Sequence, residues 1–270
     1  MRKLFIAILL LAATSIVAQE KITILHTNDT HSCIEPEKNG GAGVLNRALL
    51  IEAIKDSVGA ENVLLFDCGD FSQGSLYYNT FKGSVEVEIM NAMGYDAGAV
   101  GNHEFDFGME NLARLVKTAH YPILCANYDF TGTPCEGLIH PTAIIERKGV
   151  KIGLFGLSPN PVGLISKDYY AGIEYLPPIE TANKCAQELR EQGCDVVICL
   201  SHLGYRMPNE TCDDERLAAA TKGIDLILGG HSHTYFKEPA KLINAEGKEV
   251  IVQQMNKNGR YLGVVTLTFE

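Results

Sequence analysis

The sequence predicts an α/β protein in which two β-sheets pack together and are flanked by helices. Short apolar runs alternate along the chain with segments of helical apolar spacing, which is typical of largely parallel sheets with helical connections. Five of the apolar runs end in Asp, Asn or His, where the strands of such a sheet would lead into functional loops. The paired strands expected at 143–156 and 249–269 add antiparallel content, so two packed sheets fit better than one open sheet.

The strands are assigned from short apolar or β-branched runs bounded by turn residues. Two of them are joined by Lys148-Gly149, a turn signal, and the last two have a strong β composition. The expected strands are 22–27, 63–66, 97–100, 122–126, 143–146, 151–156, 196–200, 224–228, 249–253 and 261–269.

The helices are assigned from apolar spacing and from the glycines at their ends. The first opens after Gly40-Gly41 and has apolar positions at Val44, Leu45, Leu49, Leu50 and Ile54. The others are expected at 85–93, 112–119, 180–192 and 217–221, and two of these end at Gly94 and Gly193.

The first eighteen residues have the anatomy of a secretory signal peptide. Arg2 and Lys3 form a basic start, 4–13 is unbroken apolar sequence, and Ala18 precedes polar residues. The run is shorter than the roughly 20 apolar residues of a membrane span, so an uncleaved anchor or a buried first helix is the weaker alternative. We expect a signal peptide at 1–18 and one exported domain at 19–270, periplasmic or secreted, with no membrane span after cleavage. No linker or internal repeat divides that domain.

Composition and charge exclude several classes of protein. With 46% hydrophobic residues among 270, the chain is not intrinsically disordered. The formal net charge is −10 and becomes −12 once the two positive charges of the leader are removed. Such a charge opposes binding to nucleic acid polymers and to anionic membranes. Any phosphate-bearing ligand would therefore need positive charge supplied locally.

Eight cysteines are compatible with disulfides in an exported protein. Cys68 and Cys199 lie within apolar strands, where a thiol is usually a small buried hydrophobe. A framework of four bridges is therefore not expected, and no CxxC pair indicates a thiolate zinc site. One or two bridges remain open among Cys125, Cys135, Cys185, Cys194 and Cys212.

The polar residues at the strand ends include five of the eight histidines of the chain. Imidazole and carboxylate donors without thiolate suit zinc, manganese or iron. There are more candidate ligands than one tetrahedral ion needs, but their number suits two ions about 3.5–4 Å apart that share one carboxylate ligand. Asp70 is the natural candidate for the shared carboxylate. We expect Asp29 with His31, and His231 with His233, to point to one side because each pair alternates along an extended segment. The set is Asp29, His31, Asp70, Asn102, His103, His202, His231 and His233.

Each of these residues taken alone has an ordinary structural explanation. His202 could be a polar loop residue, Gly69-Asp70 a turn, and Asn28-Asp29 a helix cap. The metal hypothesis depends on their joint placement at the ends of five strands. His26, His120 and His140 fit no such pattern, and we expect His26 to be a hydrogen-bonded histidine within the first strand.

The motifs around these residues resemble those of the calcineurin-like metallophosphoesterases. They are DTH at 29–31, GD at 69–70, GNHEFD at 101–106, SHLG at 201–204 and GGHSH at 229–233. The segments GNHEFDFG and TNDTHS are most similar to the 5′-nucleotidase branch, and the motif order covers 22–270.

The resemblance implies a four-layer αββα sandwich with a centre of two divalent cations. It implies that one ion is held by Asp29, His31, Asp70 and His233, and the other by Asp70, Asn102, His202 and His231. It also implies that His103 is the catalytic histidine, oriented by Asp106. Some members of the branch carry Gln where this chain has His233, and an imidazole there binds a cation more tightly and can change the preferred metal.

The chemistry expected of such a centre is phosphoester hydrolysis. Two cations polarise the phosphoryl oxygens and lower the pKa of a bridging water, which gives a hydroxide that attacks phosphorus in line with the leaving oxygen. His103 would stabilise developing charge or protonate the leaving group, and Asn102 would join it in holding the phosphate.

The substrate is less well determined by the sequence. In the 5′-nucleotidase family, a C-terminal domain supplies base-stacking aromatics and phosphate-binding arginines, and we expect that domain to be missing here. The first hypothesis is a nucleotide phosphomonoesterase that works alone or with a separate C-terminal-domain polypeptide. The alternatives are a 2′,3′-cyclic-nucleotide phosphodiesterase, a nucleotide-sugar hydrolase, or a non-catalytic subunit that needs a substrate-binding partner.

Overall fold

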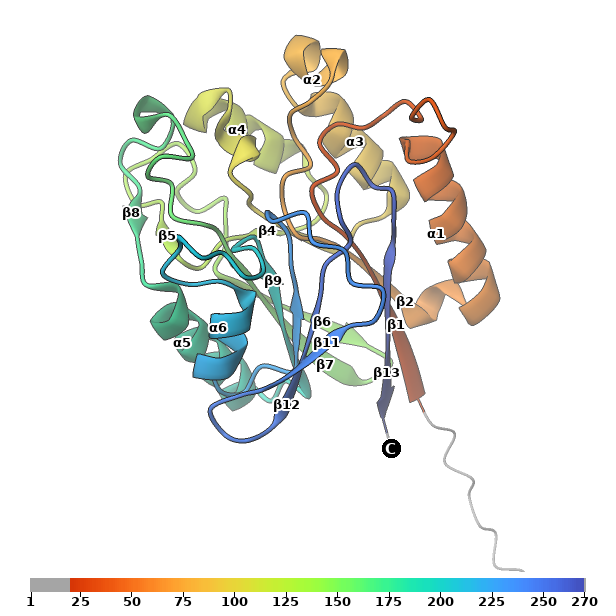
Figure 1. The fold of residues 1–270 in the computed structure, drawn as a ribbon, viewed down its shortest axis with the longest axis vertical. Helices are drawn as coiled ribbons and strands as arrows, with labels where there is room; N and C mark the ends of the chain where they lie inside the picture. The colour runs from red at the N-terminus through yellow and green to blue at the C-terminus, as the bar shows by residue number, and fades with distance from the viewer. Residues whose placement is uncertain (1–19, 270) are drawn as a thin grey trace, which may run out of the picture.

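The computed structural model describes residues 20–269 and shows two sheets packed face to face between two helical layers (Figure 1). The predicted signal peptide at 1–18 lies outside the described residues. Among residues 20–269, none of the helices combines the length and the apolar character needed to cross a lipid bilayer.

The first sheet has the strand order β13-β1-β2-β3-β4. Its strands β1, β2, β3 and β4 run parallel, and β13 pairs antiparallel with β1. The bounds are β1 Glu20–Thr27, β2 Val63–Asp67, β3 Ala97–Ala99, β4 Ile123–Leu124 and β13 Gly263–Phe269.

The second sheet has the order β11-β12-β10-β9-β7-β6, with parallel pairing from β7 through β9 and β10 to β12. A separate two-stranded ribbon joins β5 to β8. The bounds are β5 Tyr128–Asp129, β6 Thr142–Arg147, β7 Val150–Leu157, β8 Glu174–Tyr175, β9 Val196–Ser201, β10 Leu226–Leu228, β11 Ala240–Ile243 and β12 Glu249–Gln253.

The helices cover the outer faces of the two sheets. In Figure 1, α1 and α3 lie on the side of the first sheet, and α5 and α6 on the side of the second. The bounds are α1 Val44–Val58, α2 Leu76–Phe81, α3 Ser84–Met93, α4 Gly108–Thr118, α5 Pro178–Glu191 and α6 Asp214–Ala220, with the short 3-10 turns η1 Ala60–Asn62, η2 His103–Phe105 and η3 Lys167–Tyr169.

Three apolar clusters hold the four layers together. The central cluster lies between the sheets and joins Ile22 and Ile24 of β1 to Leu154 of β7 and Ile198 of β9. Leu25, on the opposite face of β1, belongs instead to the cluster beneath α1, α3 and α4. The third cluster lies beneath α5 and α6. The αββα sandwich expected from the sequence is therefore confirmed.

The first helix turns only some of its expected apolar positions toward the core. Leu45, Leu49 and Leu50 are 74%, 70% and 48% exposed, whereas Arg47 and Ile51 are buried. The inward face of α1 carries Ile51 together with Val44, Ala48 and Ile54, which pack against the core, and the buried Arg47 lies among them. Of the five apolar positions expected for this helix, Val44 and Ile54 therefore pack inward, and the three leucines do not.

Other expectations also need correction. The strands at 249–253 and 261–269 do not pair with each other, because β12 lies in the second sheet and β13 in the first. The structure also contains α2, β5, β8 and β11, which were not expected from the sequence. All eight cysteines are free in this structure, so none of the bridges left open is present. Seven are buried, and only Cys33 is partly exposed.

Candidate metal centre

The polar residues expected at the strand ends do converge at one edge of the two sheets. Because β1, β2 and β3 run parallel, as do β9 and β10, their carboxyl ends meet where the two sheets face each other. The loops that follow these strands carry Asp29, Asp70, Asn102, His202 and His231.

The backbone at this edge is turned rather than extended. Asp29, His31, Asp70, His231 and His233 have φ angles of 49°, 44°, 56°, 69° and 53°. Non-glycine residues enter this left-handed region rarely, and they cluster where function requires it. Asp29 and His31 belong to one donor cluster, whereas His231 and His233 belong to two different ones, and left-handed turns replace the extended alternation that was predicted.

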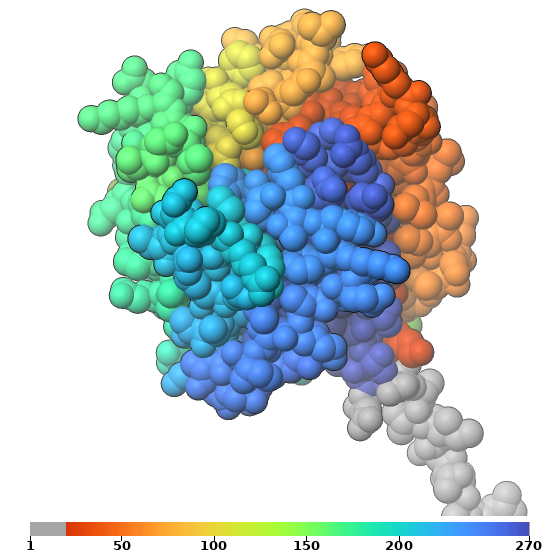
Figure 2. All heavy atoms as spheres, in the orientation of Figure 1, coloured from red at the N-terminus to blue at the C-terminus, as the bar shows by residue number. Residues whose placement is uncertain are grey.

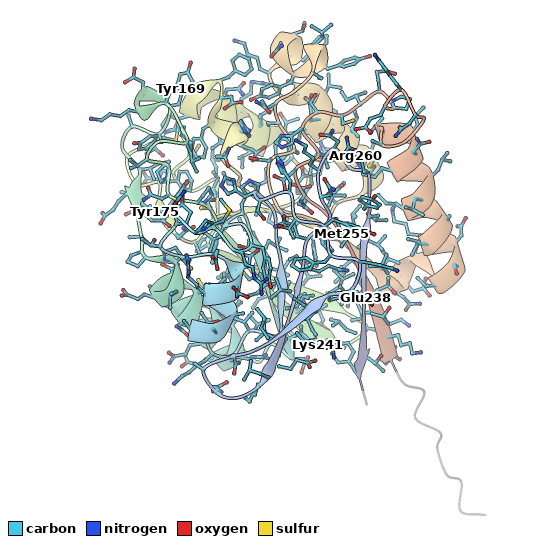
Figure 3. All side chains as sticks on the ribbon, viewed as in Figure 1. Tyr169, Tyr175, Glu238, Lys241, Met255 and Arg260 are labelled. Atoms are coloured by element: carbon cyan, nitrogen blue, oxygen red, sulfur yellow. The ribbon has the colours of Figure 1, made fainter. Side chains whose placement is uncertain are left out.

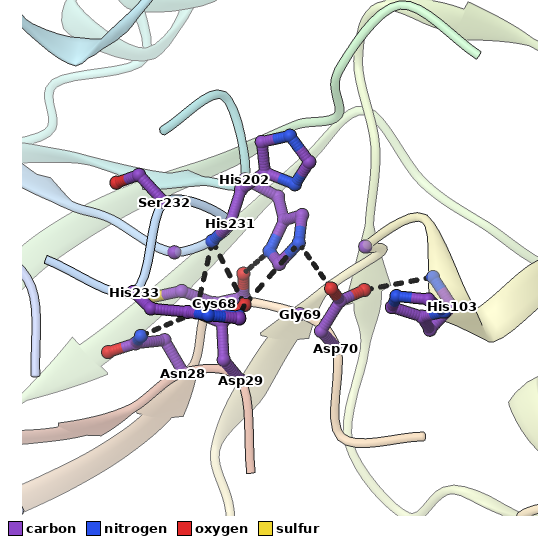
Figure 4. A network of polar contacts seen from close by, with 12 residues as sticks. Asn28, Asp29, Cys68, Gly69, Asp70, His103, His202, His231, Ser232 and His233 are labelled. Atoms are coloured by element: carbon purple, nitrogen blue, oxygen red, sulfur yellow. Dashed lines mark hydrogen bonds and ion pairs between the residues drawn. The ribbon is translucent and has the colours of Figure 1, made fainter. Parts of the chain in front are cut away.

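The first donor cluster consists of Asp29, His31 and His233, whose ligand atoms all lie within 4.8 Å of one another. Asp29 Oδ1 is 3.3 Å from His233 Nε2 and 3.9 Å from His31 Nε2. The two imidazole Nε2 atoms are 3.1 Å apart. Asp29 also accepts a hydrogen bond of 2.6 Å from Asn28 Nδ2, which fixes the carboxylate (Figure 4).

The second donor cluster consists of Asp70, His202 and His231. Asp70 Oδ2 lies 2.9 Å from His202 Nε2. The Nδ1 of His202 lies 2.6 Å from the carbonyl oxygen of Cys68, and since a carbonyl can only accept, Nδ1 carries a hydrogen. The two clusters adjoin, because His202 Nε2 is also 3.9 Å from Asp29 Oδ1.

The imidazoles at this edge differ in their affinity for protons. Burial lowers the pKa of His231 to about 4 and that of His31 below its usual value, so both are neutral at neutral pH. Burial opposes the charge on His202 as well, but the adjacent Asp70 carboxylate outweighs it and raises the pKa of His202 to about 10. A cation that binds His202 must therefore displace a proton.

The donor set fits divalent cations. Four imidazoles and two carboxylates lie in two adjoining clusters, and no thiol belongs to either. Asn102 Oδ1 is buried and has no hydrogen-bond partner among the described residues, while His202 Nε2 has only the Asp70 carboxylate beside it. An orphaned atom of this kind points to a missing ligand at the site.

His103 lies beside the two clusters and is positioned by two carboxylates. Its Nδ1 is 3.0 Å from Asp106 Oδ2, and its backbone N–H donates to Asp70 Oδ1 over 2.9 Å. Burial lowers the pKa of His103, but the hydrogen bond to Asp106 and the nearby acidic charges outweigh it and raise the pKa above its usual value.

A cavity of about 520 Å³ opens directly beside these side chains. Its wall includes His31, His103 and His233 from the candidate centre, Tyr77 from α2, and Lys257 from the loop between β12 and β13. A phosphate ester at the donor clusters would have room here for the group attached to its phosphate.

Two residues that support the site were not singled out from the sequence. The Glu104 carboxylate accepts backbone N–H bonds from Asp70 (3.0 Å), Gly101 (2.6 Å) and Ser72 (3.1 Å) and so ties two site loops together. Burial and the charge of Asp70 raise the pKa of Glu104 to about 7. Asn28 holds Asp29, as described above. Both lie inside the quoted motifs, but nothing in the sequence separated their supporting roles from those of their neighbours.

Comparisons with known proteins place the chain in a family. The family model described as calcineurin-like phosphoesterase matches residues 22–235. A snake venom 5′-nucleotidase from Gloydius brevicauda is 32% identical over 96% of this chain and 47% of its own length. The human 5′-nucleotidase is 30% identical over 93% of this chain and 47% of its own length.

Solved structures of similar proteins share the fold. A 5′-nucleotidase precursor from Thermus thermophilus is 33% identical, with a TM-score of 0.81 over 93% of this chain and 52% of its own. A calcineurin-like phosphoesterase from Bacillus subtilis is 28% identical, with a TM-score of 0.79 over 94% of this chain and 86% of its own. The chain thus spans about half the length of the 5′-nucleotidases it matches. With the family model covering more than half of its residues, the chain belongs to the calcineurin-like phosphoesterase family.

Proposed function

We propose that this chain is an exported hydrolase that removes the phosphate from nucleotide phosphomonoesters, in the manner of a 5′-nucleotidase. The observation that carries the proposal is the pair of adjoining donor clusters next to the hydrogen-bonded His103 and Asp106. Relatives named 5′-nucleotidase, at about one-third identity, support the choice of substrate class.

The proposed centre holds two divalent cations, zinc, manganese or iron. Asp29, His31 and His233 would hold one of them, and His202, His231 and Asn102 the other. Asp70 would bridge the two. In support of the bridge, Asp70 contacts His202 at 2.9 Å, and its charge also acts on His31 of the other cluster.

When bound, the two cations would supply charge that polarises the phosphoryl oxygens and activates a water molecule as the nucleophile. The residues of the chain prepare the rest of the site. Asp106 holds the Nδ1–H of His103, so that Nε2 is free to face the substrate. With its pKa raised, His103 keeps a proton at Nε2 that it can donate to the leaving oxygen.

The leaving group of the substrate would occupy the 520 Å³ cavity beside His103. With a net charge of −10, the protein attracts no anion from a distance, so the substrate phosphate must be held by the cations together with Asn102 and His103. We further propose that a separate polypeptide, similar to the second half of the longer relatives, docks over this cavity to recognise the base.

The proposal is tested by phosphate release from a panel of esters. The panel contains nucleoside monophosphates, a 2′,3′-cyclic nucleotide, a nucleotide sugar and a bis-aryl phosphodiester. Hydrolysis of each ester is measured with untreated protein, with EDTA-treated protein, and with protein to which zinc, manganese or iron has been restored. We expect AMP and its relatives to be the preferred substrates, with activity lost to EDTA and regained with metal.

The other outcomes discriminate among the alternatives. Preference for the cyclic nucleotide or the nucleotide sugar would replace the monoesterase assignment by the corresponding activity. Absence of chelator-sensitive hydrolysis of every ester would support a non-catalytic subunit. Full activity on AMP without any added polypeptide would refute the docking partner.

A further inference from the structure

A small polar cavity lies behind the loop that carries His31. It is bordered by the loop residues Thr30 and Ser32, by Arg47 of α1, and by Glu86 of α3. About 10 Å³ of it is open to the centre of a water molecule, which is about the smallest space that holds one water. It is separate from the 520 Å³ cavity in front of His31.

Two of the residues that line this cavity carry three buried polar atoms with no hydrogen-bond partner among residues 20–269. Arg47 is 8% exposed, and its Nε and Nη1 are buried without an acceptor. Glu86 is 5% exposed, and its Oε2 is buried without a donor. The guanidinium forms no ion pair with any carboxylate of residues 20–269 within 4.0 Å, so the charged groups of Arg47 and Glu86, which both line this cavity, are separated by a gap with no direct contact.

The two side chains together define what can fill the gap. Arg47 offers two N–H donors, and Glu86 offers one acceptor. A halide ion would accept hydrogen bonds from Arg47 but would be repelled by the Glu86 carboxylate. A monovalent cation would be attracted by Glu86 but repelled by Arg47. A water molecule accepts from the guanidinium with its lone pairs and donates to the carboxylate, so it alone satisfies both.

The other oxygen of Glu86 connects this cavity to the metal loop. Ser32, the residue after His31, donates its hydroxyl to Glu86 Oε1. Ser32 Oγ also lies 2.5 Å from Ser75 Oγ, which caps the first turn of α2. Glu86 thereby fixes a loop in which His31 and Ser32 both have left-handed backbones.

Arg47 supports a second wall of the site. A Cβ placed on Gly259 would lie 2.4 Å from Arg47 Nη1, so Gly259 packs directly against the guanidinium. The same segment reaches the metal loop through the Asn258 N–H, which donates to the Asp29 carbonyl over 2.7 Å. Beyond it, Arg260, labelled in Figure 3, pairs with Glu37 at 2.7 Å. In Figure 2 the dark blue segment near the C-terminus lies against the red and orange residues of this region.

We propose that one buried water molecule bridges Arg47 and Glu86, and that this bridge positions the loop of His31 for metal binding. Arg47 and Glu86 are positioning residues in this view, since neither touches a cation or a substrate. The inference rests on the proposed function only in treating His31 as a metal ligand.

The bridge itself is tested by a high-resolution crystal structure, with a second crystal soaked in bromide. We expect one water within hydrogen-bond distance of both Arg47 and Glu86 Oε2, and no anomalous bromide peak there. An empty cavity, a bound bromide or a direct contact between the two side chains would refute the bridge. This readout requires neither metal nor activity.

The positioning role is tested by direct metal titration against a competing chelator. In Arg47→Met the bridge is lost, and we expect the affinity for at least one of the two cations to fall by about 10- to 100-fold, the usual effect of losing a group that supports a metal ligand. Arg47→Lys keeps one charged donor and should recover part of that loss.

The matched control is Arg190→Met, which removes another arginine. Arg190 lies on α5, far from the candidate metal centre, and pairs with Asp225. The control variant should lower the urea midpoint but leave metal affinity within about twofold of wild type. If Arg47→Met lowers the midpoint yet binds metal as well as Arg190→Met does, Arg47 is only structural and the positioning role is refuted.

If Arg47→Met does not fold, Ser32→Ala, which cuts the link to Glu86 without burying a charge, must show the same loss of affinity. Failure of the wild type to bind any cation would refute the proposed function instead.

Discussion

Replacing His26 by Gln tests how strongly one buried imidazole weakens the protein in acid. His26 lies on β1, is fully buried, and has its Nε2 3.0 Å from Gln253 Oε1. Because that oxygen can only accept, Nε2 carries the hydrogen, and Nδ1 is left buried without a partner. A second proton would have to sit on Nδ1 as an unpaired charge. Burial accordingly lowers the pKa of His26 to about 4, although the hydrogen bond to Gln253 opposes this.

The magnitude follows from the two protonation equilibria. The unfolded chain binds the proton with the ordinary pKa of 6.5, and the folded chain with a pKa of about 4. A difference of about 2.5 corresponds to about 3.4 kcal/mol. Since the unfolded state takes up the proton first, the free energy of unfolding is intact above pH ~6.5 and falls as the pH drops toward ~4. By pH ~4.5 the loss from His26 alone is about 2.6 kcal/mol.

The assay is urea unfolding, followed by circular dichroism, at pH 7.5 and pH 4.5 with EDTA present throughout. Gln at position 26 keeps an N–H for Gln253 but cannot titrate. We therefore expect wild type to lose about 2.6 kcal/mol more than His26→Gln between the two pH values. His120→Gln, at an exposed position, is the matched control and should behave as wild type does.

Comparing variants removes the contributions that they share. Burial raises the pKa of Asp67 and Asp214 to about 7, so these carboxyls favour the folded state as the pH falls and oppose the effect of His26. Their contribution is the same in all three proteins and cancels. If wild type and His26→Gln change by the same amount within about 0.5 kcal/mol, the reasoning about the buried imidazole is wrong.

Three further predictions concern the candidate centre. His103→Ala should lower kcat by about 10²- to 10⁴-fold with the metal content, measured by mass spectrometry, unchanged; lost metal would make His103 a ligand instead. Asp70→Ala should lose both cations, and a variant that retains two would refute the bridging assignment. Gly101→Ala places a Cβ 2.2 Å from Asp70 Oδ1, so it should reduce metal content and, as a consequence, phosphate release by at least about tenfold; full metal occupancy would show that the loop can shift at no cost.

The sequence was sufficient for what depends on local pattern. The positions of β1, β2, β3, β9 and β10, each followed by polar residues, were predicted to within a few residues, because strand length and apolar composition are local properties. The convergence of five such loops follows from parallel pairing, which alternating strands and helices already indicate. His26 was expected to be a hydrogen-bonded, partly buried histidine of the first strand; it is hydrogen-bonded there through Nε2, but it is fully buried and its Nδ1 has no partner.

What failed depends on contacts between distant residues. The exposure of Leu45 and Leu49 and the burial of Arg47 in α1 could not be predicted from residue type, because they depend on which neighbours pack against the helix. The left-handed turns at Asp29 and His231 are imposed by the loops packed around them, since neither residue type requires a positive φ. The pairing of β13 with β1 joins the two ends of the described chain, and no local pattern specifies a partner at that separation.

The distribution of thiols has a practical consequence. Seven of the eight cysteines are buried, and Cys33, the one that is partly exposed, lies in the wall of the cavity beside His31. A thiol-reactive fluorophore added to the native protein should therefore label a single position. Its emission would report on whatever enters the cavity, so substrate binding and cation binding could be followed in real time without any engineered cysteine.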